Sequence, residues 1–160
     1  MTELERIAEE LRRAASGDAW HGDSIAKTLE GVTAEQAAAK PLANAHSVWE
    51  LVLHVTYWLD AITLAMNGTP LVQHSVPGYM QMNFPPVKSA EEKAWEEAKA
   101  RLMESAGKCA AAIAKFDPAK FHNKVPGRQY DFSYALPGIV SHSIYHAGQI
   151  AILKKALSAK

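Results

Sequence analysis

The sequence predicts an all-α protein built as a four-helix bundle. Apolar residues recur at helical spacing in four long segments, and cap residues precede most of them. No segment alternates polar and apolar residues over a convincing strand length, and no internal repeat is visible. Four long helices in 160 residues make a bundle the economical architecture. We therefore expect one domain that covers residues 1–160.

The chain opens on a helix with a cap at each end. Thr2 and Glu5 have the spacing of a capping box, in which each side chain accepts a hydrogen bond from the other residue's backbone N–H. Apolar residues follow at positions 4, 7 and 11, and Gly17 ends or kinks the helix. Short helical pieces are expected between residues 23 and 40.

The second long helix is predicted over residues 48–66. Ser47 and Glu50 form another capping box, and Asn67-Gly68 is a typical stop signal. Residues 69–88 contain four prolines and a glycine, so this segment is predicted to be a loop.

The third and fourth long helices lie in the second half of the chain. Ser89 and Glu92 predict a cap for the third helix, which Asp117-Pro118 breaks. The fourth helix is expected over about residues 135–157, with Pro137 near its first turn. All three connections are long enough to span a helix, so loop length does not decide the bundle topology.

Composition argues against several classes of function. Lys+Arg and Asp+Glu balance at 17 each, which disfavours a nucleic-acid partner. A single cysteine fits a reducing compartment, and the amphipathic N-terminus does not resemble a signal peptide. No apolar run is long enough to cross a membrane. We therefore expect a cytoplasmic protein with neither a membrane nor a nucleic-acid partner.

Three histidines form the main candidate site. His142 and His146 are four residues apart on the fourth helix, so their side chains converge and could chelate one metal ion. His54, on or beside an apolar face of the second helix, could supply a third ligand. Ser143 stands where H-E-x-x-H metalloproteases carry their general base, which disfavours that mechanism. Two hydrogen-bonded imidazoles without a metal remain the alternative interpretation of the pair.

At these residues the sequence resembles the DinB-like superfamily of metal-binding four-helix bundles. Three segments carry the resemblance, which covers nearly the whole chain: Ala19-Trp20-His21-Gly22 with Leu29-Glu30-Gly31-Val32, His46 to His54, and His142 to Ile150. The resemblance implies that His54, His142 and His146 are metal ligands. It also implies a right-handed up-down-down-up bundle with a crossover between the second and third helices, and a homodimer.

Relatives of this kind include thiol-dependent S-transferases and a thiol-dependent isomerase. Three imidazoles suit zinc or nickel first, with iron as a further candidate, and they leave a coordination position open. We therefore expect a metal-dependent thiol S-transferase or a hydrolase that acts on a small molecule, with a low-molecular-weight thiol as a further cofactor. The alternatives are a metal-binding stress-response protein without turnover and a dimeric interaction scaffold.

Several other residues have both a functional and an ordinary interpretation. His21 either lines the metal cleft or binds substrate, or lies on the surface. Glu50 either orients His54 or only caps its helix. Gln149 lies one turn beyond His146 and could either hydrogen-bond a ligand or hold a contact between helices. Cys109 shares a heptad stripe with Trp95 and is expected to be a buried, inert thiol. The apolar segment 74–86 could roof the metal cleft, join a dimer contact or pack against the side of the bundle.

Overall fold

The computed structural model describes residues 1–158, and this part of the chain is all-helical. It contains no strand, only two isolated bridges, Ala19 with Gly22 and Lys124 with Asp131. Seven α-helices and one 3₁₀ helix follow one another along the chain: α1 (Glu3–Ser16), α2 (Ile25–Leu29), α3 (Ala34–Ala38), α4 (Val48–Met66), α5 (Tyr79–Asn83), α6 (Glu92–Ala114), η1 (Pro118–Lys120) and α7 (Phe132–Ser158).

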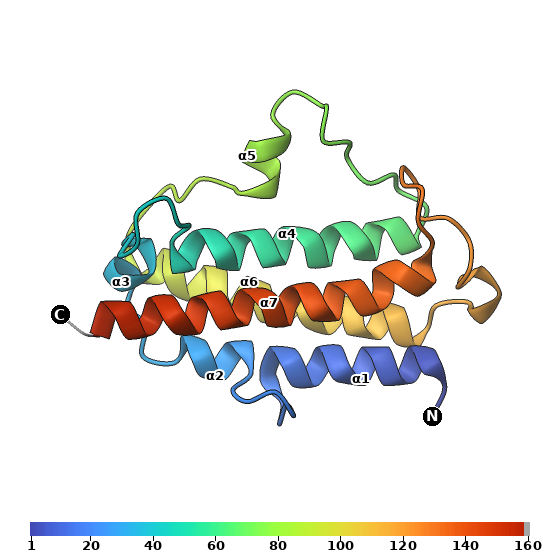
Figure 1. Cartoon of the computed structure of the whole chain (residues 1–160), viewed down its shortest axis with the longest axis horizontal. Coiled ribbons are helices and arrows are strands. Elements are labelled where there is room, and N and C mark those ends of the chain that lie inside the picture. Colours follow the sequence, from blue (N-terminus) through green and yellow to red (C-terminus); the bar gives the residue numbers. More distant parts are fainter. Residues whose placement is uncertain (159–160) are drawn as a thin grey trace.

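The four longest helices lie side by side and enclose the apolar core (Figure 1). Both α1 and α4 pack against α6 and against α7. Their facing surfaces bury large side chains completely, among them Ile7, Val52, Trp95, Leu102 and Ile150. Burial of this apolar surface is the main force that holds the helices together.

The shorter helices lie at the edges of this arrangement. Helix α2 packs on α7, and α3 packs on α4 and α6. Helix α5 sits over α4, within a connection that runs back along the molecule from the end of α4 to the start of α6 (Figure 1). This connection brings α5 over α4, the helix that carries one candidate ligand.

Most of the predicted helix boundaries are confirmed. Capping boxes form at Thr2 with Glu5 and at Ser47 with Glu50, and a third forms at the start of α3. Helix α1 is capped at Gly17, and α4 ends at Asn67. These boundaries depend on interactions between residues at most four apart, which the sequence shows directly.

The cap predicted at the start of α6 is wrong. Helix α6 begins at Glu92 after an N-cap residue, Glu91, whose side chain makes no capping bond. The hydroxyl of Ser89 accepts instead from the Glu91 backbone N–H at 3.2 Å. The Glu92 carboxylate accepts from the backbone N–H of Ala34 at 2.9 Å, so it serves the start of α3 and not its own helix.

Helix α7 begins at Phe132, three residues before the predicted start. The Asp131 carboxylate accepts from the Tyr134 backbone N–H at 3.1 Å, which satisfies one donor of the first turn. Pro137 consequently lies inside the helix and not in its first turn.

None of the helices in residues 1–158 combines the length and the apolar character that a membrane-spanning helix needs.

Candidate metal centre

Two long helices supply the three predicted ligands. His54 lies in the first half of α4, and its side chain is 4% exposed. His142 and His146 lie one turn apart near the middle of α7, where His146 is 7% exposed and His142 is partly buried. The helical spacing of α7 brings His142 and His146 together. Because α4 and α7 pack against each other, this pair also meets His54, which lies 88 positions before His142 in the chain.

The Nε2 atoms of the three rings converge. His142 Nε2 lies 3.0 Å from His54 Nε2 and 3.1 Å from His146 Nε2. One nitrogen from each ring lies within 4.8 Å of the other two. Three ligands about 2.1 Å from a tetrahedral ion would place their donor atoms about 3.4 Å apart, so small movements would accommodate a metal.

The opposite ring nitrogens show which tautomers are present. His54 Nδ1 donates to the backbone carbonyl oxygen of Asn83 at 2.7 Å, because a carbonyl oxygen only accepts. His146 Nδ1 donates to Oε1 of Gln149 at 2.6 Å. In a neutral ring these bonds leave the Nε2 lone pair free. His142 Nδ1 is buried without a hydrogen-bond partner.

Burial keeps these imidazoles neutral. It lowers the pKa of His54 to about 4 and that of His142 to about 3, and it lowers the pKa of His146 in the same direction. The nearby His146 lowers the first two further. Neutral imidazole is the form that binds a metal ion, so all three rings are ready to act as ligands at neutral pH.

The cluster could hold a cation between its nitrogens. Three unprotonated Nε2 atoms at this separation repel one another through their lone pairs. A proton on His142 Nε2 could be donated either to His54 Nε2 or to His146 Nε2, so it would relieve the repulsion with only one of these two nitrogens at a time. One metal ion would satisfy all three nitrogens together, and the donor set and the fixed tautomers of His54 and His146 fit such an ion.

Comparison with known families agrees with this geometry. A family model described as the DinB superfamily matches residues 19–150, which is most of the chain. The chain belongs to the DinB superfamily. No curated protein and no solved structure gives a significant match.

The segment around α5 covers the candidate site of this DinB-superfamily protein. The ring of Phe84 stacks on His54 with centroids 4.0 Å apart, and its other face stacks on His46 at 3.8 Å. The side chain of Asn83 accepts from Trp58 Nε1 at 2.8 Å. Segment 74–86 therefore covers the cluster. A roof over the metal cleft was one of the three positions that the sequence allowed for this segment.

Asn83, Phe84 and Trp58 were missed as individual site residues. The apolar character of segment 74–86 was the only signal for Asn83 and Phe84. It did not show which residue would meet His54, because that depends on how the long connection folds back.

The two residues predicted to support the ligands on α4 and α7 have different surroundings. Gln149 contacts His146 directly. Glu50 accepts from the Ser47 backbone N–H at 2.8 Å and from Lys40 Nζ at 2.9 Å, and His46 Nδ1 lies 3.3 Å away. Burial would raise the pKa of Glu50, but these bonds and the Lys40 charge leave it lowered. None of these bonds reaches His54, so Glu50 acts as a helix cap and ion-pair partner.

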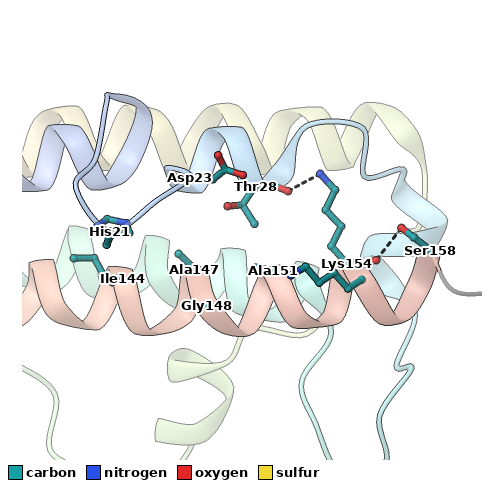
Figure 2. A pocket seen from close by; sticks show the side chains of 10 residues that line it. His21, Asp23, Thr28, Ile144, Ala147, Gly148, Ala151, Lys154 and Ser158 are labelled. Atoms are coloured by element: carbon teal, nitrogen blue, oxygen red, sulfur yellow. Dashed lines mark hydrogen bonds between the residues drawn. The ribbon is translucent and has the colours of Figure 1, made fainter.

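His21 lies apart from the three-histidine cluster. It is exposed in the loop between α1 and α2 and lines a cavity of about 710 Å³ beside Ile144, Ala147 and Gly148 (Figure 2). Those residues lie on the side of α7 opposite to His142 and His146, since helical positions turn by about 100° each. The structure thus separates His21 from the ligands.

A smaller apolar cavity lies next to the cluster. It has a volume of about 190 Å³, and His142 lines it together with Trp58, Ile62, Tyr130 and Ile139.

Cys109 lies away from this cavity. It is completely buried on α6, and burial raises the pKa of its thiol to about 11. A buried thiol that holds its proton this firmly is not a nucleophile at neutral pH.

Proposed function

We propose that His54, His142 and His146 bind one divalent transition metal ion, and that the protein uses it in thiol transfer to, or hydrolysis of, a small electrophile. The observation that carries this proposal is the convergence of three Nε2 atoms from neutral rings, two of them buried and that of His142 partly buried. The rings of His54 and His146 are also oriented by hydrogen bonds from their Nδ1 atoms. Zinc and nickel are the first candidates and iron is next, because an all-imidazole site disfavours magnesium and calcium.

Each part of the surroundings has a role in this proposal. The three imidazoles hold the ion, while Asn83 and Gln149 fix the rings of His54 and His146. When bound, the ion supplies Lewis acidity that lowers the pKa of a coordinated water or thiol. The cavity beside His142 offers apolar walls to the carbon skeleton of the electrophile. Segment 74–86 excludes water from one side of the site.

Metal analysis tests the binding step directly. Protein purified without an affinity tag should contain about one transition metal ion per chain, and His142→Ala should lose it. His21→Ala is the matched control, since His21 lies outside the cluster, and should retain the metal. Unmodified protein that takes up no stoichiometric metal from added zinc, nickel or iron would overturn the proposal.

Turnover distinguishes an enzyme from a protein that only binds metal. We expect the metal-loaded protein to transfer a low-molecular-weight thiol to a small electrophile or to hydrolyse an ester, and His54→Ala to abolish turnover. The second candidate function is a metal-binding stress-response protein or scaffold. It is favoured by the position of the cluster, which would tie α4 to α7. A metal-dependent rise in melting temperature without turnover across such panels would support this second function.

We also propose that α1, α4, α6 and α7 form the up-down-down-up bundle that the family resemblance implies. The support is the long connection between α4 and α6, which returns along the molecule and provides the crossover (Figure 1).

A further inference from the structure

The cavity that His21 lines lies between α2 and the side of α7 that faces away from the three histidines. One wall is the segment 21–28, and the facing wall is formed by Ile144, Ala147, Gly148 and Ala151 of α7 (Figure 2). We call this space of about 710 Å³ the α2–α7 cavity. Pockets that bind small organic molecules have volumes of about 300–1,000 Å³, so the α2–α7 cavity is large enough for such a ligand.

The α7 wall of the cavity is apolar and leaves room at its centre. Ile144, Ala147 and Ala151 present aliphatic side chains to the space. A Cβ atom added to Gly148, which lies between them, would meet nothing within 4 Å. Glycine weakens a helix relative to alanine, but it allows another molecule to approach the backbone closely. The apolar body of a ligand could therefore lie flat against this wall.

Lys154 reaches across one end of the cavity from α7 to α2. Its Nζ atom donates to the backbone carbonyl oxygens of Thr28 at 3.0 Å and Glu30 at 2.6 Å. Those carbonyls lie at the end of α2, where the helix itself supplies no donor. The two bonds use two of the three N–H donors of an ammonium group, which leaves one for a ligand. The charge of Lys154 is thus held in place before a ligand arrives.

The charged residues that line the cavity are unevenly distributed. The exposed Lys155 follows Lys154 and lines the same end. Asp23 is the one carboxylate among the lining residues that the structure describes, and in Figure 2 it lies on the far side of Thr28 from Lys154. An anionic group is therefore attracted to the end that carries the two lysines.

We propose that the α2–α7 cavity binds a small organic anion with an apolar body. The anionic group lies at the end with Lys154 and Lys155, and the apolar body lies on the α7 wall over Gly148. His21, which Figure 2 places over Ile144, lies toward the opposite end. This site is separate from the candidate metal centre, so the proposal does not rest on the proposed function.

Fluorescence titration with two probes of one carbon skeleton tests the recognition of charge. The first, 8-anilino-1-naphthalenesulfonate, is an anion, and the second, N-phenyl-1-naphthylamine, lacks its sulfonate group. Lys155→Gln should raise the Kd of the sulfonate about two- to fivefold and leave that of the neutral probe unchanged. An equal change for the two probes, or no change for either, would overturn the assignment of an anion to this end.

Substitution of two glycines on α7 tests where the probes bind. Gly148→Leu places a side chain in the α2–α7 cavity, where the folded chain has room for it, and should raise the Kd of both probes at least about tenfold. The matched control is Gly138→Leu, at an equally open glycine that lines the cavity beside His142. It should leave both Kd values unchanged, and circular dichroism checks that both variants fold.

Three results would overturn this site. The first is an unmodified chain that binds neither probe at about 1 mM. The second is a Gly148→Leu variant with the Kd values of the unmodified chain. The third is a loss of binding in Gly138→Leu alone, which would place the probes in the cavity beside His142.

Discussion

At the scale of single residues, the three imidazoles differ in what holds the nitrogen that faces away from the cluster. The ring of His54 is fixed by a backbone carbonyl, that of His146 by a side-chain amide, and that of His142 only by packing. The Asn83 carbonyl belongs to the main chain, so its bond to His54 is lost only if segment 74–86 moves. The amide of Gln149 can be removed by one substitution, so it offers the simplest test of ring orientation.

Gln149→Leu should weaken metal binding by about tenfold to a hundredfold, because His146 loses the acceptor that fixes its tautomer. Competition with a chromogenic chelator measures the affinity. Gln149→Glu keeps an acceptor at the same place and should retain tight binding. Equal affinities for the leucine and glutamate variants would contradict this role.

The metal-free protein should lose stability as the pH falls from about 6.5 toward about 4. The folded state holds the pKa of His54 near 4 and that of His142 near 3, whereas the unfolded chain takes up protons near the ordinary value of 6.5. Stability conferred by neutral rings is therefore complete above about pH 6.5 and is lost as the pH falls toward the folded pKa values.

Urea unfolding in the presence of a chelator measures this pH dependence. His142→Leu removes one of the buried groups, so its free energy of unfolding should fall less steeply over the same range. If the two proteins show the same slope, burial of a neutral His142 does not contribute to the acid sensitivity.

At the scale of elements, the sequence predicted the features that depend on residues close together in the chain. The ends of α1 and α4 follow from capping boxes and stop signals within single turns. The His142–His146 pair follows in the same way from one turn of α7. The cap of α6 and the contact of Asn83 with His54 could not be predicted, because each joins segments far apart in the chain. His54 was convincing as a third ligand only through the family resemblance.

Helix α5 is held over α4 by a side-chain bond that can be removed separately. Trp58→Phe keeps the aromatic ring but loses the N–H that Asn83 accepts. A lost hydrogen bond of about 1 kcal/mol should raise amide exchange in residues 79–84 about fivefold, if exchange occurs by local opening. Hydrogen–deuterium exchange measures this change, and Tyr57→Phe is the control on the neighbouring position. Unchanged exchange in Trp58→Phe would show that the Trp58–Asn83 bond does not hold the segment, which would leave the His54–Asn83 bond and the stacking of Phe84 to do so.

At the scale of the whole molecule, the candidate metal centre lies between two helices from different halves of the sequence. Helix α4 packs on α6 and α7, and α7 packs on α1. A bound ion would add a direct link between α4 and α7 near their centres. Because such a link exists only in the folded chain, metal binding must raise the stability of the entire assembly of helices.

Free metal at about one hundred times its Kd should stabilise the protein by about 2.7 kcal/mol. For a chain of this length that corresponds to a rise in melting temperature of about 5–10 °C. Differential scanning calorimetry with and without zinc or nickel measures the shift. His54→Ala should show no shift, since the two remaining ligands both lie on α7 and leave α4 unlinked. An equal shift in His54→Ala would place the stabilising ion elsewhere and would exclude this link between α4 and α7.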